Sequence, residues 1–157
     1  METTEDRGPG VLIFPPVLFA LTLVTGAVLQ WFFPLPFWQA TWSRRILGAL
    51  LFLAALAFAR WGEATMRRVG TNVRPDRPST AIVEDGPFHY TRNPLYLAVM
   101  TMFVGLAQMA NSAWFLILLV PMALVLHYGV VRREERYLDA KFGEPYRAYR
   151  TRVRRYL

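Results

Sequence analysis

Four apolar stretches separated by polar segments set the pattern of this sequence. They cover residues 11–33, 46–59, 94–110 and 113–131. The first has 23 residues, enough to cross a hydrocarbon core of roughly 30 Å as a helix that rises about 1.5 Å per residue. Pro15 and Pro16 fall near its start, where missing backbone donors cost least, and Pro34 ends it. We therefore predict a membrane helix here.

The second apolar stretch is short, with 14 residues between Arg45 and Arg60. Trp42 and Trp61 suit anchoring in the membrane interface, and the two arginines can reach outward to water and lengthen the effective span. A membrane span and a re-entrant or buried helix are both open for this stretch. Residues 111–112 separate the third and fourth stretches, which predicts a tight transmembrane hairpin.

Charged residues are confined to the polar segments. Between residues 11 and 59 only Arg44 and Arg45 are charged, and between residues 94 and 131 only His127 can be. A soluble helical domain carries charges along every helix, whereas a membrane chain excludes them from its spans. The sequence therefore excludes a soluble globular protein. It predicts an all-α polytopic membrane protein with four transmembrane helices, a cytoplasmic loop and C-terminal interfacial helices, in a single domain over residues 1–157.

The basic residues also predict an orientation. Sixteen of the 18 fall on one side of a four-span arrangement, and Arg44 and Arg45 fall on the other. Because basic loops tend to stay in the cytoplasm, we expect both termini there, and the compact, arginine-rich chain favours a bacterial inner membrane. The net charge of +7 is explained by orientation and by attraction to membrane lipids rather than by nucleic acid.

The sequence offers little for metal or thiol chemistry. Cysteine is absent, which excludes a thiol nucleophile and a Cys-based zinc site. The two histidines, His89 and His127, lie in separate segments without a supporting carboxylate motif, so no metal site is expected. His127 lies near the end of the fourth stretch, where it has two open roles: a helix–helix hydrogen bond, or a base.

The loop before the third apolar stretch has features of an anion site. Asn93 and Pro94 predict a helix N-cap followed by proline at the first helical position. The free N–H groups of a helix start, together with Arg92, favour a carboxylate or phosphate ligand. Pairing of Arg92 with a lipid phosphate, or with Glu84 or Asp85, is the alternative.

The segment after the fourth stretch carries two adjacent carboxylates, Glu134 and Glu135. One reading is a local salt-bridge lattice with nearby basic residues, Arg132, Arg133 and Arg136. The other is that one glutamate accepts hydrogen bonds from the hydroxyl or ammonium groups of a ligand. Further on, Tyr146, Tyr149 and Val153 recur with helical spacing and predict an amphipathic helix, either a lipid anchor or a lid over a site.

The order of these motifs is specific. It runs Gly-Pro-Phe-x-x-Thr-Arg-Asn-Pro-x-Tyr over residues 86–96, an apolar hairpin, Arg-Glu-Glu over residues 133–135, and Phe-Gly-x-x-Tyr over residues 142–146. This resembles the isoprenylcysteine carboxyl methyltransferase and phospholipid methyltransferase superfamily of integral membrane enzymes. The sequence departs from the family's pattern at two positions: Asn93 stands where histidine is common, and Arg154 stands where proline is common.

The resemblance implies an S-adenosylmethionine site within residues 86–157 and methyl transfer to a lipophilic small-molecule or lipid acceptor at the cytoplasmic membrane boundary. The matching cofactor residues are Gly86, Phe88, Arg92, Asn93, Pro94, Tyr96, Glu134 and Glu135. Arg92 and Glu135 are the expected catalytic residues, and the acceptor is expected to enter between the third and fourth spans. An NADPH-dependent membrane reductase of related fold and a non-catalytic membrane protein are the alternatives.

Overall fold

The chain folds as a helical bundle. The structure, a computed structural model, describes residues 8–36, 38–39 and 41–156. Its helices are α1 (Pro15–Phe32), α2 (Trp42–Val69), η1 (Gly86–His89), α3 (Pro94–Ala110), α4 (Ala113–Leu126), η2 (His127–Val131), α5 (Arg132–Phe142) and α6 (Glu144–Arg152). η1 is a short 3₁₀ helix and η2 is π-helical. The described ranges contain no strand, and the predicted all-α fold is confirmed.

Three helical segments among the described residues are long and apolar enough to cross a membrane: α1, α2, and the continuous run from α4 through α5. α3 has the predicted boundaries but is a shorter apolar helix of 17 residues. The second apolar stretch forms part of a much longer helix than predicted, because α2 extends it at both ends to 28 residues. Trp42 and Trp61, both exposed, are about 28 Å apart along α2, close to the thickness of a hydrocarbon core. The polytopic membrane fold is confirmed.

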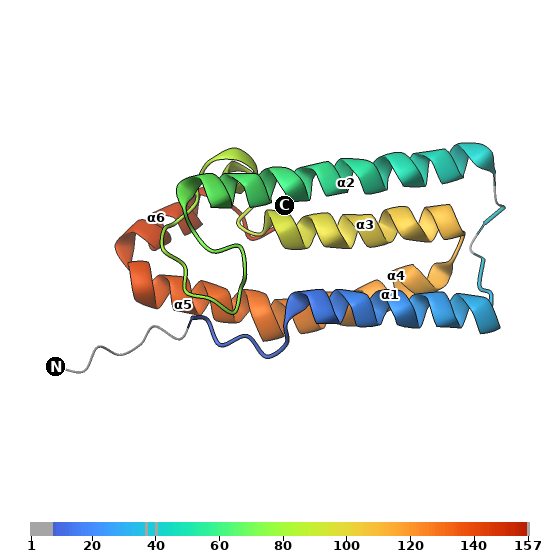
Figure 1. Cartoon of the computed structure of the whole chain (residues 1–157), viewed down its shortest axis with the longest axis horizontal. Helices are drawn as coiled ribbons and strands as arrows, with labels where there is room; N and C mark the ends of the chain where they lie inside the picture. Colours follow the sequence, from blue (N-terminus) through green and yellow to red (C-terminus); the bar gives the residue numbers. More distant parts are fainter. Residues whose placement is uncertain (1–7, 37, 40, 157) are drawn as a thin grey trace.

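The helices form a bundle with its polar segments gathered at one end (Figure 1). α2 packs on α3, α3 packs on α4, and α4 packs on α1. The loop between α2 and α3, together with α5, α6 and the last described residues, lies at one end, whereas the α1–α2 and α3–α4 connections lie at the other (Figure 1). Most of the basic residues therefore share one end of the molecule, as the proposed orientation requires.

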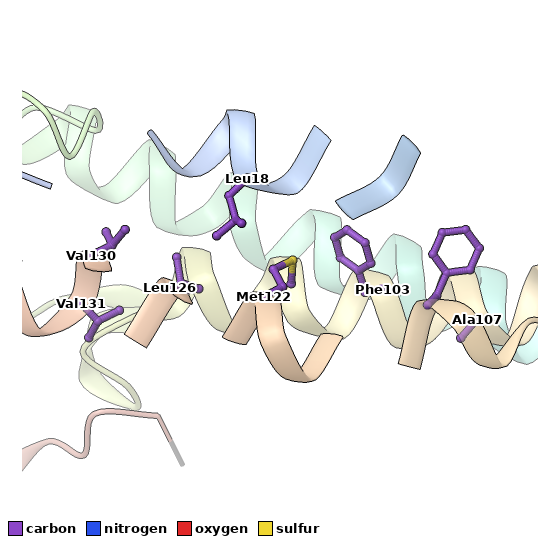
Figure 2. Packing of buried hydrophobic residues seen from close by; sticks show 8 residues of the cluster. Leu18, Phe103, Ala107, Met122, Leu126, Val130 and Val131 are labelled. Atoms are coloured by element: carbon purple, nitrogen blue, oxygen red, sulfur yellow. The ribbon is translucent and has the colours of Figure 1, made fainter. Parts of the chain in front are cut away.

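The core of the bundle joins α1, α3, α4 and η2 (Figure 2). Its buried members are Leu18, Phe103, Ala107, Phe115, Met122, Leu126, Val130 and Val131. The segment before α1 contributes to this packing, because the Leu12 N–H donates a hydrogen bond of 3.0 Å to the Gly129 carbonyl in η2. α1 is thereby fixed against the point where α4 leaves regular α-helical geometry. π-helical segments are rare and are found frequently at functional sites.

A close contact between α2 and α3 involves two glycines, Gly48 of α2 and Gly105 of α3. A Cβ atom at Gly105 would lie 2.8 Å from the Gly48 carbonyl oxygen, and a Cβ atom at Gly48 would lie 2.8 Å from that of Gly105. Real Cβ atoms essentially never come this close to another heavy atom. The two backbones therefore approach more closely than any side chain would allow.

Gly105→Ala is expected to destabilise the protein by about 1–3 kcal/mol, because the added methyl group overpacks this contact. Gly129→Ala is the control, since the nearest atom to its Cβ would be Leu12 Cβ at an ordinary 3.6 Å. Thermal unfolding in detergent, followed by circular dichroism, compares the two variants. Equal melting temperatures would contradict a close α2–α3 contact.

The apolar face of α6 packs on the protein itself. Tyr146, Tyr149 and Val153 share one buried face, as their spacing predicts. That face contacts Ile82, Leu138 and Phe142. Its residues are therefore not a lipid anchor, and α6 instead closes the end of the bundle that holds the polar segments.

Candidate functional site

A tight turn at η1 holds the first motif in place. Gly86 has a φ angle of +59°, which favours glycine, and a Cβ atom there would lie 2.8 Å from Thr65 Oγ1 and 3.2 Å from Trp61 Nε1. The turn buries Phe88, whose carbonyl accepts a hydrogen bond of 2.8 Å from Tyr149 Oη. η1 is therefore tied to both α2 and α6, beside the tryptophan that suits the membrane interface.

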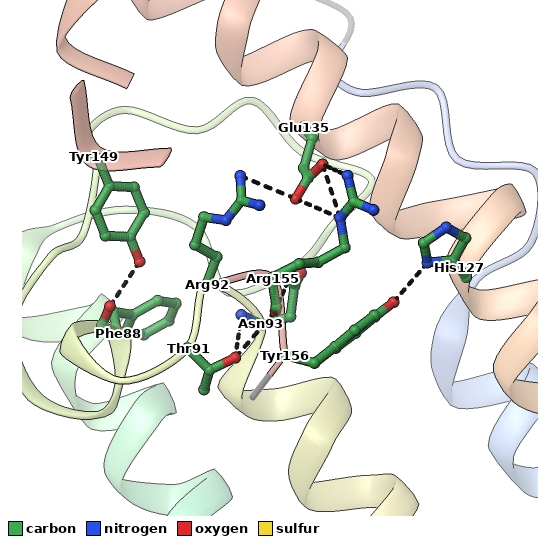
Figure 3. A network of polar contacts seen from close by, with 9 residues as sticks. All are labelled: Phe88, Thr91, Arg92, Asn93, His127, Glu135, Tyr149, Arg155 and Tyr156. Carbon is green, nitrogen blue, oxygen red and sulfur yellow. Dashed lines mark hydrogen bonds and ion pairs between the residues drawn. The ribbon is translucent and has the colours of Figure 1, made fainter. Parts of the chain in front are cut away.

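Residues 153–156, here called the C-terminal strap, are hydrogen-bonded to the start of α3 (Figure 3). The Arg92 N–H donates to one strap carbonyl at 2.9 Å, and the side chains of Thr91 and Asn93 donate to the Arg155 carbonyl at 3.1 and 3.0 Å. Asn93 is the N-cap residue of α3, as predicted, but its side chain makes no capping hydrogen bond. That side chain instead donates its hydrogen bond to the Arg155 carbonyl of the strap.

Glu135 is buried and binds two arginines (Figure 3). Arg155 donates to both carboxylate oxygens, with a shortest distance of 2.6 Å, and Arg92 Nη1 lies 3.3 Å from Oε1. The hydrogen bonds to Glu135 raise the pKa of the Arg155 guanidinium. The expected lattice with neighbouring arginines is therefore wrong for this glutamate, because the strap brings in a partner 20 residues away.

Glu134 has a different environment from its neighbour. Tyr96 Oη donates to Glu134 Oε1 at 2.7 Å. Within the described part of the chain, no arginine or lysine forms an ion pair with this carboxylate. The two adjacent glutamates therefore differ: one is neutralised by two guanidinium groups, and the other is held by a single phenol.

A cavity of about 300 Å³ lies beside these groups. Six of the predicted site residues line it: Phe88, Arg92, Asn93, Pro94, Tyr96 and Glu134. Gly86 and Glu135 are outside its lining. Much of the remaining wall is apolar and comes from α1 with the residue before it, α2 and α3, including Phe14, Phe19, Ala59, Leu95 and Val99. No residue of α4 lines the cavity, so the expected acceptor route between the third and fourth spans is not the one that the structure offers.

A second, smaller cavity of about 80 Å³ adjoins the first. Met66, Phe88 and Arg92 line both, so they form the wall between the two. Tyr146 lines the smaller cavity, and burial raises the pKa of its hydroxyl to about 12. That hydroxyl therefore stays protonated at neutral pH.

Arg92 is the residue best placed to bind a ligand. Its side chain is only 9% exposed, and although Nη1 lies 3.3 Å from Glu135 Oε1, neither Nη1 nor Nε makes a hydrogen bond to the described residues. Buried donors are normally paired, and an unpaired one costs free energy. A carboxylate or phosphate bound in the cavity would supply the missing acceptor, which fits the anion that the sequence predicts here.

His127 is not placed to act in the cavity. Its Nδ1 atom lies 3.0 Å from Tyr156 Oη in the strap (Figure 3). Its ring also contacts that of Tyr128. It is absent from the lining of both cavities. Of the two roles that the sequence left open, the structure favours the hydrogen bond, but its partner lies in the strap and not on another helix.

Comparison with known proteins assigns the family. The sequence model of phospholipid methyltransferases matches residues 43–145, well over half of the chain. The chain belongs to the phospholipid methyltransferase family. The resemblance that the motifs indicated is thereby confirmed, and the match to this family of membrane methyltransferases includes all the predicted site residues from Gly86 to Glu135. α1 and the C-terminal strap lie outside the matched range.

Two bacterial relatives extend this comparison. A nickel-cobalt-cadmium resistance protein, NccN, of Alcaligenes xylosoxydans is 31% identical over 108 residues, which is 68% of this chain and 48% of the relative. An uncharacterised protein of Haemophilus influenzae is 39% identical over 64 residues, which is 40% of this chain and 90% of the relative. The match thus spans about half the length of NccN. No solved structure matches the chain.

Proposed function

We propose that this chain transfers a methyl group from S-adenosylmethionine to a lipophilic acceptor at the cytoplasmic boundary of the membrane. The observation that carries the proposal is the buried guanidinium of Arg92, whose Nε and Nη1 donors make no hydrogen bond to the described residues, at the polar end of a largely apolar cavity. Membership of the phospholipid methyltransferase family supports the same reaction.

The residues present fit this cofactor. S-adenosylmethionine supplies an electrophilic methyl group on a sulfonium, and it also carries a carboxylate and an ammonium group. Arg92 would bind the carboxylate, since guanidinium groups pair with carboxylates through two parallel hydrogen bonds. Glu135 lies beside Arg92, outside the cavity lining, and would hold that arginine in position. Phe88 and Tyr96 would offer aromatic faces, which attract cations.

The protein's contribution to such a reaction is orientation and the exclusion of water. A direct displacement of the methyl group needs no nucleophile from the protein, in agreement with a chain that lacks cysteine. Orientation of two reactants can account for a large part of a rate enhancement, and apolar walls keep competing water away from the reacting groups. α1, α2 and α3 provide those walls.

The position of the site supports an acceptor that comes from the lipid phase. η1 contacts Trp61, and the cavity lies on the α1–α2 side of α3, next to the lipid-facing surfaces of both helices. An amphiphile can reach such a cavity while its tail stays in the membrane. With the basic end of the bundle in the cytoplasm, both termini lie on that side, and we propose a bacterial inner membrane as the location.

Calorimetric titration of the detergent-purified protein tests the proposal. S-adenosylhomocysteine, the product form of the cofactor, is expected to bind with one site per chain, and NADPH is expected not to bind. NADPH binding in its place would favour a reductase of related fold. Binding of neither compound would favour a non-catalytic membrane protein.

A further inference from the structure

The two adjacent glutamates, Glu134 and Glu135, have different hydrogen-bond partners. Both oxygens of Glu135 are occupied by Arg155, and Arg92 lies close to one of them. Glu134 lines the large cavity, and only its Oε1 atom accepts a hydrogen bond, from Tyr96. Its Oε2 atom receives none from the described residues. Glu134 is therefore a carboxylate with a free oxygen facing a largely apolar space.

We infer that Glu134 accepts a proton from the methyl acceptor, and that the reacting group of this acceptor is an amine, hydroxyl or thiol rather than a carboxylate. The inference rests on the proposed function and narrows its substrate class. Tyr96 acts as a positioning residue, because its hydroxyl fixes one oxygen of Glu134 and leaves the other for the acceptor.

The physical reason is the cost of an unpaired carboxylate in apolar surroundings. A buried carboxylate is stabilised by a cation or by a hydrogen-bond donor, and it repels a second carboxylate. A protonated amine, a hydroxyl or a thiol offers what Glu134 lacks. Of the two arginines among the described residues that line the cavity, Arg92 lies in the first motif, and the cofactor carboxylate would occupy it.

Arg74 also lines the cavity, but it is already engaged. It forms two hydrogen bonds with Asp76, at 3.0 and 2.7 Å, and its guanidinium lies 5.2 Å from the centre of the Phe14 ring. An acceptor carboxylate next to Glu134 would therefore have to compete with Asp76 for this guanidinium. His127 is excluded as the proton acceptor, because it is bonded to Tyr156 and lies outside the cavity lining.

The step balances with the groups named. The acceptor's N–H, O–H or S–H bond breaks, and the proton moves to Glu134. The electron pair left on the acceptor atom forms the new bond to the methyl carbon. The pair of the broken carbon–sulfur bond stays on sulfur, which gives S-adenosylhomocysteine as the second product. Glu134 then returns its proton to water before the next cycle.

Binding of small amphiphiles tests the inference without turnover. Hexylamine, hexan-1-ol and hexanoate share one apolar chain and differ in the head group. With the wild-type protein saturated with S-adenosylhomocysteine, calorimetry is expected to show hexylamine binding at least tenfold more tightly than hexanoate, with hexan-1-ol between them. Hexanoate binding as tightly as hexylamine would overturn the inference, and this comparison needs no variant.

Glu134→Gln gives the second comparison, since it removes the charge but keeps the shape. It is expected to reduce the preference for hexylamine at least tenfold and to leave the affinity for S-adenosylhomocysteine within about threefold. Tyr96→Phe is expected to reduce the preference by a smaller factor. Asp139→Asn, on the same helix, is the control, because its carboxylate pairs with Arg147 outside both cavities. An unchanged preference in Glu134→Gln would overturn the inference.

The two proposals fail in different ways. If the wild-type protein does not bind S-adenosylhomocysteine, the proposed function fails and the inference fails with it. If that ligand binds but head-group preference is absent, only the role of Glu134 is wrong. A methyl-transfer assay with labelled cofactor adds a third readout, in which methylation of hexanoate in preference to hexylamine would also count against it.

Discussion

Replacing Arg92 with alanine is expected to weaken the binding of S-adenosylhomocysteine more than tenfold, a loss of more than about 1.4 kcal/mol. The substitution removes a charge-assisted contact in a site where the side chain is 9% exposed. It also takes one of two guanidinium groups away from Glu135, whose side chain is only 10% exposed. Glu135→Ala is expected to cause a loss of the same order, since it leaves Arg92 and Arg155 without their shared partner.

Calorimetry on folded, detergent-purified variants measures this effect. Arg132→Ala is the matched control, because this arginine lies at the start of α5, contacts the Tyr128 ring at 5.7 Å and lines neither cavity. Arg92→Lys keeps the charge but loses the planar pair of donors, so it is expected to recover only part of the affinity. Unchanged binding in Arg92→Ala would mean that Arg92 and Glu135 form an ion pair with a purely structural role.

The fold was largely predictable because lipid imposes a simple rule on the sequence. Charged residues stay out of the spans, so the gaps between charges outline the helices, and α3 begins and ends where the sequence predicts. The second helix was harder to delimit. Arg45 and Arg60 end the apolar stretch but not the helix, since both side chains can reach toward water while the backbone continues. The limits of an apolar stretch therefore indicate which residues lie in the membrane, but not where the helix begins and ends.

The site was predictable only in part: the motif residues could be found from the sequence, whereas the strap and the apolar wall could not, for physical reasons. The motif residues meet because the first motif precedes α3 and the second lies on α5, two elements at the same end of the bundle (Figure 1). Arg155 was missed because it follows the last residue of α6, in a strap without helical periodicity. The wall that Phe14 and Phe19 provide was also missed. An apolar stretch does not reveal which of its residues face a cavity rather than lipid.

Truncation after Gly143 is expected to abolish both S-adenosylhomocysteine binding and methyl transfer while the membrane helices remain inserted. It removes the partner of Glu135 and the tyrosine hydroxyl that binds the Phe88 carbonyl. It also removes the strap carbonyls that accept hydrogen bonds from Thr91, Arg92 and Asn93. Insertion depends on the apolar stretches, so extraction of the truncated chain from membranes is expected to require detergent, as for the full chain.

Two neighbouring substitutions distinguish the ion pair made by the strap from the steric cover that the strap provides. Arg155→Ala is expected to weaken S-adenosylhomocysteine binding at least tenfold, because Glu135 loses its bidentate partner and Arg92 is left to satisfy the buried carboxylate alone. Arg154→Ala is expected to have little effect, because this exposed side chain is replaced while the carbonyl that binds the Arg92 N–H is kept. Calorimetry on both variants decides between the two. Full binding in the truncated protein, or equal losses in the two variants, would show that the strap covers the end of the bundle without ordering the charged groups of the site.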